Sequence, residues 1–150
     1  MILTKKRIDE VILGLLDTYN TNDPYELCAY LNIKLIKVDS TNPLLLGEPA
    51  LYIKNLHGNE VIFINNDLNY SYNKFYLSHE LGHALLHPFI RNSFNSNLIN
   101  IDKMEHQANY FAIKLMKIKF NSIELHQMTL EQIASCLELP NGVLKQLVKI

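Results

Sequence analysis

The sequence predicts an α+β fold in which a small sheet, of about three strands, accompanies a mostly helical core. Three observations lead to this prediction. Short β-branched runs lie only between residues 33 and 64. Apolar residues recur at helical spacing before residue 31 and after residue 71. Hydrophobic residues make up 48% and charged residues 19% of the chain, which is typical of a folded globular protein. Because 150 residues is the size of one ordinary domain, we expect a single domain over residues 1–150.

Two helices are expected ahead of the sheet. Residues 5–19 carry apolar side chains at the spacing of a helix that buries one face. Asp23 followed by Pro24 is typical of an N-cap and a first helical position, so a second helix begins there. Asn32 is expected to end it.

The sheet is expected from three short runs. Residues 33–38 are rich in β-branched side chains and predict a strand with one buried face. Residues 51–53 and 61–64 are separated by a segment that contains His57-Gly58-Asn59, and they predict a β-hairpin.

The second half of the chain is expected to be helical. Its predicted helices cover about residues 72–86, 102–117, 129–138 and 141–149, with a polar loop at 87–100. The last two form a C-terminal helical hairpin at about 129–149, whose pattern resembles a helix-turn-helix. The charged residues of this hairpin are two acidic and two basic side chains, Glu131, Glu138, Lys145 and Lys149. Such a segment would neutralise phosphates poorly, so we expect it to pack on the core or to dock a substrate rather than to bind nucleic acid.

Charge and cysteine content exclude several classes of protein. With 14 basic and 15 acidic residues the formal net charge is -1, so no overall field favours nucleic acid or anionic lipid. Cys28 and Cys136 lie in no CxxC or Cys-His cluster, which fits reduced thiols in a cytoplasmic protein. No stretch of about twenty apolar residues is present, so no membrane span is expected.

The most informative segment is His79-Glu80-Leu81-Gly82-His83, which has the pattern His-Glu-x-x-His within a predicted helix. Four residues along a helix advance about 400° and about 6 Å, so His79 and His83 project from nearly the same face and can bind one ion. Glu80 lies about 100° around the helix, where it is no primary ligand but can reach a water molecule beside the ion. This arrangement predicts a metal site with Glu80 as the catalytic base.

A third ligand must come from elsewhere in the chain. Phe89 stands where a metzincin would have its third histidine, and His87 is about 12 Å along the helix from His79, too far to share the ion. Glu105 is the best candidate, because it lies on one helical stripe with Ala108 and Ala112, which permit close helix packing. The alternatives on the same helix are Asp102 and His106. Two histidines and a glutamate with a fourth position open to water are typical of catalytic zinc.

These residues carry a family resemblance. Residues 78–87, Ser-His-Glu-Leu-Gly-His-Ala-Leu-Leu-His, together with residues 105–112, Glu-His-Gln-Ala-Asn-Tyr-Phe-Ala, resemble the ImmA/IrrE family of bacterial and phage metallopeptidases. The order of the elements before them is similar as well, so the resemblance covers nearly the whole chain. One departure is Ser78, where the family more often has alanine.

The resemblance implies a gluzincin-like fold, a zinc ion held by His79, His83 and Glu105, and a zinc endopeptidase activity with Glu80 as the base. It also implies a substrate class, the helix-turn-helix repressors that silence phages and other mobile elements. An oxyanion donor is expected among nearby side chains, namely Tyr70, Tyr72, Tyr76, His87, His106 and Tyr110. Two alternatives remain at this stage: an antirepressor that binds without catalysis, and a DNA-binding regulator that uses the C-terminal helices.

Overall fold

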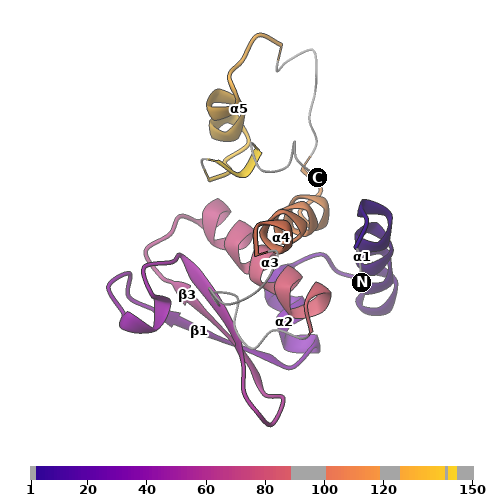
Figure 1. The fold of residues 1–150 in the computed structure, drawn as a ribbon, viewed down its shortest axis with the longest axis vertical. Helices are drawn as coiled ribbons and strands as arrows, with labels where there is room; N and C mark the ends of the chain where they lie inside the picture. Colours follow the sequence, from indigo (N-terminus) through magenta and orange to yellow (C-terminus); the bar gives the residue numbers. More distant parts are fainter. Residues whose placement is uncertain (1–2, 89–100, 119–125, 141, 145–150) are drawn as a thin grey trace.

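The protein is described by a computed structural model that covers residues 3–88, 101–118, 126–140 and 142–144. Helices and strands follow one another in an α+β order, as predicted (Figure 1). The elements are α1 (Lys5–Tyr19), α2 (Pro24–Tyr30), β1 (Ile33–Val38), a 3-10 turn η1 (Pro43–Leu45), β2 (Ala50–Lys54), β3 (Glu60–Asn65), α3 (Tyr70–Leu86), α4 (Ile101–Leu115) and α5 (Leu130–Cys136). The predicted loop at 87–100 and the predicted helix at 141–149 fall mainly outside the described residues.

The sheet has the strand order β1-β3-β2. The predicted hairpin is confirmed, with β2 antiparallel to β3 and Ala50 opposite Ile64. β1 pairs with β3 in parallel, with Ile33 opposite Glu60. This pairing leaves β2 on one edge of the sheet, where it contacts α3.

The helix ends show why the N-terminal helices begin where they do. The Thr4 side chain accepts a hydrogen bond from the Arg7 N–H at the start of α1. The Asp23 side chain accepts one from the Tyr25 N–H and so caps α2, whose first residue is Pro24. Each cap satisfies a backbone donor that has no partner inside its helix. The predicted N-cap of α2 is therefore confirmed, whereas the helix ends at Tyr30 with Leu31 as its C-cap, slightly before the predicted Asn32.

α3 and α4 pack closely against each other (Figure 1). A Cβ atom on Gly82 would lie 3.0 Å from Cδ1 of Phe111 and 3.3 Å from Cα of Ala108. The glycine of one helix and the alanine of the other thus let the two backbones approach, as the small residues of the predicted stripe require. This close approach brings the histidine-bearing face of α3 to the acidic face of α4.

α3 is the central helix of the molecule. Every residue from Leu77 to Ala84 is buried, including polar ones, because the sheet and α2 cover it on some sides and α4 on another. A helix buried all round loses the polar stripe of a surface helix. The polar groups of α3 are therefore in the interior, where each needs a partner.

The C-terminal segment packs on the ends of α3 and α4. A cluster of buried side chains joins Phe75, Ala112, Ile113, Ala134, Leu139, Val143 and Leu144. α5 begins with a capping box in which Thr129 and Gln132 each accept a backbone N–H of the other. The first helix of the predicted hairpin is present, and the second stays a prediction.

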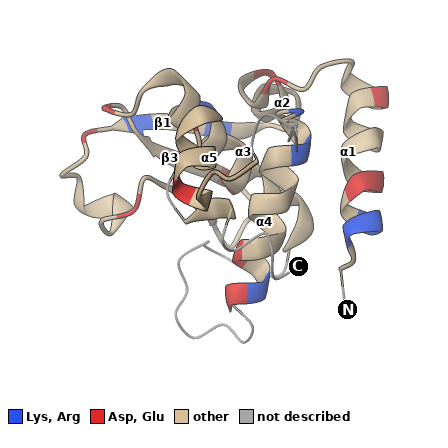
Figure 2. Ribbon diagram, turned by 90° about the horizontal axis from the view of Figure 1, so that it is seen from above, with Lys and Arg blue, Asp and Glu red and all other residues tan. Residues whose placement is uncertain are grey.

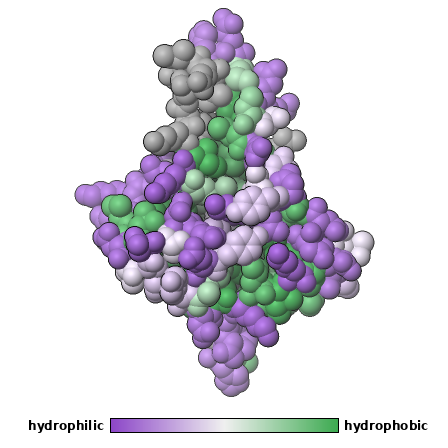
Figure 3. All heavy atoms as spheres, turned by 180° about the vertical axis from the view of Figure 1, so that it is seen from behind, coloured by the Kyte–Doolittle hydropathy of each residue, from purple (hydrophilic) through white to green (hydrophobic). Residues whose placement is uncertain are grey.

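The molecular surface is mixed in character. In the described part of the chain, Lys and Arg are spread over α1, β1 and α4 rather than gathered on one element (Figure 2). On the face drawn in Figure 3, apolar surface forms separate patches between polar side chains. Among the described residues, no helix is long and apolar enough to cross a membrane.

Ser78 offers a direct test of how tightly α3 is buried. Its side chain is fully buried, and in the described part of the chain its hydroxyl has no hydrogen-bond partner. Because an unsatisfied buried hydroxyl costs about 1–3 kcal/mol, Ser78→Ala is expected to stabilise the fold by about 1 kcal/mol. Urea unfolding measures the change. Ser135→Ala on the exposed side of α5 is the matched control and should gain only a few tenths of a kcal/mol from helix propensity. Destabilisation by Ser78→Ala would contradict the assignment.

Candidate metal centre

α3 and α4 bring together three of the side chains that the sequence predicts as ligands. His79 Nε2 lies 3.1 Å from Glu105 Oε2, and His83 Nε2 lies 2.9 Å from Glu105 Oε1. The two Nε2 atoms are 3.2 Å apart. Ligand atoms of all three residues lie within 4.8 Å of one another, and no other group of three His, Cys, Asp or Glu side chains in the described ranges meets that condition.

The geometry of this trio fits a zinc ion. Zinc binds imidazole nitrogen at about 2.0–2.1 Å, so two ligand atoms on a tetrahedral ion stand about 3.3 Å apart. The separation of the two Nε2 atoms, 3.2 Å, is close to that value. Two imidazoles and one carboxylate are also a donor set of catalytic zinc. Glu105 is 35% exposed and His83 only 1%, so the site opens to solvent on the carboxylate side.

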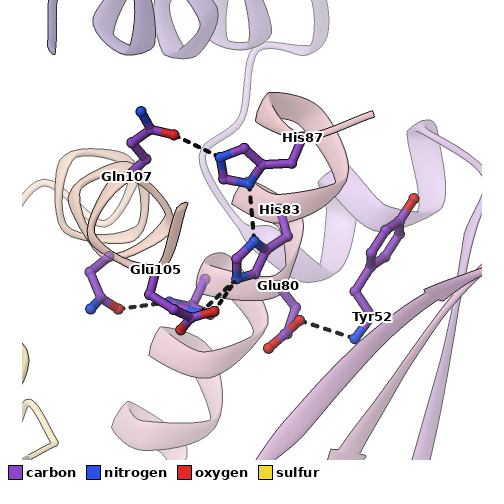
Figure 4. Close-up of polar contacts among 8 residues, drawn as sticks. Tyr52, Glu80, His83, His87, Glu105 and Gln107 are labelled. Atoms are coloured by element: carbon purple, nitrogen blue, oxygen red, sulfur yellow. Dashed lines mark hydrogen bonds and ion pairs between the residues drawn. The ribbon is translucent and has the colours of Figure 1, made fainter. Parts of the chain in front are cut away.

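Side chains on the Nδ1 side of the two histidines hold both rings in place, and Figure 4 shows this for His83 and His87. His79 Nδ1 lies 2.7 Å from Oδ1 of Asn109 on α4. His83 Nδ1 lies 3.0 Å from Nδ1 of His87, which is the C-cap residue of α3. Each Nε2 atom therefore faces Glu105 while each Nδ1 atom is bound behind it, which is how metal-binding imidazoles are usually oriented.

Electrostatics favour the ligand forms of His83 and Glu105. Burial lowers the pKa of His83 to about 4, so its ring is neutral at pH 7. Burial raises the pKa of the Glu105 carboxyl, but its hydrogen bonds and charge interactions with His79 and His83 outweigh burial and hold the pKa well below the usual range. Burial lowers the pKa of His79 as well, but the hydrogen bond and charge of Glu105 raise it above the usual value. The Glu105 carboxylate is thus the negative charge to which a cation in this position would bind.

Glu80 lies between α3 and the sheet. It is buried, and its Oε2 atom accepts a hydrogen bond of 3.0 Å from the backbone N–H of Tyr52 on β2 (Figure 4). Glu80 is thus attached to the edge strand while its neighbour His79 faces α4. This is the position beside the ligand trio that the sequence predicts for a base.

The other sequence candidates lie elsewhere. Asp102 is exposed and His106 is partly buried, and neither joins the ligand trio. His87 lies outside the trio and contacts His83, as its position at the helix end suggested. Of the proposed oxyanion donors, Tyr110 donates its hydroxyl to Asp9 of α1, and Tyr70 is 71% exposed.

A known family matches a part of the chain that includes these residues. The model of the IrrE N-terminal-like domain, which is a peptidase family, matches residues 28–147 of the chain. The chain belongs to this family. Membership of the ImmA/IrrE metallopeptidases, predicted from the sequence, is thereby confirmed, and it implies a metal ion. Of the described residues, the trio in α3 and α4 is the group able to hold one.

Two relatives of this IrrE-like chain have been identified. It is 38% identical over 111 residues to the uncharacterized immunity region protein 2 of Bacillus phage phi105, and the aligned region covers 73% of this chain and 67% of that protein. It is 32% identical over 151 residues to metallopeptidase ImmA of Bacillus subtilis strain 168, and the aligned region covers 95% of this chain and 84% of that protein. No solved structure matches the chain significantly.

Sequence reasoning assigned no role to three residues that contact this site. Asn109 follows Glu105 by four positions and therefore shares its helical face, so the spacing carried a signal for it. Gln107 lies 2.8 Å from His87 through its amide oxygen, although it lies on another face of α4. Tyr52 contacts Glu80 through its backbone, which no side-chain pattern indicates.

Proposed function

We propose that this chain is a zinc endopeptidase that cleaves a helix-turn-helix repressor of a phage or mobile element. The observation that carries the proposal is the convergence of His79 Nε2, His83 Nε2 and the Glu105 carboxylate from two helices, with Glu80 beside them. In this assignment His79, His83 and Glu105 bind the metal, and Glu80 is the catalytic base.

The chemistry of hydrolysis divides between the ion and the protein. A bound zinc ion would act as a Lewis acid that polarises the scissile carbonyl and makes water more acidic. Glu80 takes the proton of the attacking water and returns it to the leaving amine. Because Tyr52 N–H binds one carboxylate oxygen, the Glu80 side chain is held in one orientation for both transfers. His79 and His83 keep their Nε2 atoms directed at the ion through the partners of Nδ1.

The substrate class rests on the relatives rather than on the site. One relative is a phage immunity region protein, and the other is a metallopeptidase named ImmA. A repressor that maintains phage immunity is the protein whose cleavage would end it. The substrate we propose is therefore a helix-turn-helix repressor that maintains phage immunity, and a repressor encoded in an adjacent gene is the first candidate to test.

A DNA-binding role for the C-terminal helices has little support in the charges. Described residues 126–140 contain Glu131 and Glu138 and neither Lys nor Arg, so they bring no cation to a phosphate. Apolar side chains of this segment, Ala134 and Leu139, are buried against α3 and α4. The apolar side chains of this segment are therefore used for packing on the core.

The decisive experiment incubates the purified protein, loaded with zinc, with that repressor. We expect discrete cleavage products with zinc and none after treatment with a chelator. A stable complex without cleavage would instead identify an antirepressor that acts by binding alone. Salt-dependent binding of the purified chain to duplex DNA, without cleavage, would favour the regulator.

A further inference from the structure

His87, the C-cap residue of α3, is buried although it is neither a proposed ligand nor the proposed base. It is 1% exposed and follows His83 by one helical turn, and its backbone N–H bonds to the His83 carbonyl at 3.0 Å. Burying an imidazole in the interior is unfavourable unless its nitrogens are hydrogen-bonded. The partners of both nitrogens are therefore informative.

His87 is the middle of a continuous chain of hydrogen bonds. His83 Nδ1 lies 3.0 Å from His87 Nδ1, and His87 Nε2 lies 2.8 Å from Oε1 of Gln107 (Figure 4). Nε2 of Gln107 then donates to the backbone carbonyl of Leu3 at 3.3 Å. The series runs from the metal centre through α4 to the residue before the N-cap of α1.

The direction of every bond in this series follows from its Leu3 end. The Leu3 carbonyl can only accept, so the Gln107 amide presents its NH₂ there and its oxygen to His87. His87 must then carry a proton on Nε2, which leaves Nδ1 of the neutral ring as an acceptor. Nδ1 of His83 consequently donates and its Nε2 is unprotonated, so that a cation rather than a proton would stand between this nitrogen and the Glu105 carboxylate.

The same direction follows from the other end. A nitrogen that binds zinc must be unprotonated, so His83 carries its proton on Nδ1. That proton requires an acceptor, and the nearest group is His87 Nδ1. Both ends demand one pattern of donors and acceptors.

We propose that His87 and Gln107 are positioning residues that hold the His83 ring, and its tautomer, for metal binding. This inference rests on the proposed zinc site. Nδ1 of His79 contacts Oδ1 of Asn109, and the ring of His83 is held by two side chains in series that end on a backbone carbonyl. The docking of the segment before α1 is thereby connected to the metal centre. The term positioning relay is used below for His83, His87, Gln107 and the Leu3 carbonyl.

Zinc affinity tests the positioning relay. His87→Phe keeps a ring without nitrogens, and Gln107→Met keeps the chain length without the amide. Each is expected to weaken zinc binding about 10–100-fold, as loss of an outer-shell partner typically does. The double variant should be about as weak as either single variant, because both changes interrupt the same relay. Affinity is measured by competition with a chromophoric chelator on protein whose fold is verified by circular dichroism.

Two controls separate this inference from the proposed function. Ser78→Ala removes a buried hydroxyl next to His79 that is outside the positioning relay, and it should bind zinc like the parent chain. If the parent binds no zinc, the proposed function fails. If the parent binds zinc and the two relay variants bind it equally tightly, only the positioning relay is refuted. The same holds if the effects of the two substitutions simply add.

A measurement on the unsubstituted protein needs no variant to fold. Proton–nitrogen NMR correlations of the histidine rings in the zinc-loaded chain identify which nitrogen of each ring is protonated. We expect His87 to carry its proton on Nε2 and to have an unprotonated Nδ1. A proton on Nδ1 of His87 would leave His83 without its acceptor and would overturn the proposal.

Discussion

Replacing Glu80 by glutamine is expected to reduce peptidase activity by about 10² to 10⁴-fold while zinc binding is retained, because general acid–base catalysis contributes about that factor. The structure shows why this substitution should change the chemistry of the site without changing its shape. Glu80 is buried and accepts the Tyr52 N–H, and the amide oxygen of a glutamine can accept the same hydrogen bond. The shape of the site is then preserved and only the proton acceptor is lost. Activity on the repressor and zinc content of the same samples are measured together.

The matched control for Glu80→Gln is Glu48→Gln. Glu48 is a mostly exposed glutamate near the site: partial burial of its carboxylate raises its pKa most, and the charge of Glu105 raises it further. Its substitution removes one negative charge from the same surroundings at a side chain that is neither a proposed ligand nor the proposed base, and it should leave activity near the parent level. Cleavage by Glu80→Gln at the parent rate would show that Glu80 is not the base.

The element boundaries in the first half of the chain could be predicted because local signals decide them. The Asp23-Pro24 cap and the β-branched run of β1 are complete within a few residues, and the structure confirms both. The parallel pairing of β1 with β3 could not be predicted from local signals. It depends on Ile33 and Glu60 meeting across a long connection, and neither strand indicates its partner in its own sequence.

The same distinction applies to the site. His79 and His83 could be placed together because the helix spacing determines where they point, and Glu105 could be chosen because its alanine neighbours predict close packing. Gln107 could not, since its role depends on the position of Leu3, more than a hundred residues away in the chain. The chemistry within one helix and one partner on the neighbouring helix could therefore be predicted, whereas the other contacts between elements could not.

Replacing Glu105 by alanine or glutamine is expected to cause the largest loss of metal. Its two carboxylate oxygens lie 3.1 Å from His79 Nε2 and 2.9 Å from His83 Nε2, so one side chain contacts both other ligands. Loss of an outer-shell partner costs about 10–100-fold in affinity, and loss of a charged ligand should exceed that. Metal content after dialysis, together with chelator competition, measures the change.

The controls for Glu105 are the two rejected ligands of the same helix. Asp102 is exposed one turn earlier and His106 is adjacent, and neither lies in the trio. Asp102→Ala and His106→Ala should therefore bind zinc as the parent does, although each removes a group that binds metals in other proteins. Glu105→Gln separates charge from shape: it can still form hydrogen bonds in the same space, but it cannot neutralise a divalent cation. The assignment would be wrong if Glu105→Gln bound zinc as tightly as the parent while the Asp102 or His106 variant bound it more weakly. The third ligand would then be Asp102 or His106, and the side on which the site opens to solvent would have to be assigned again.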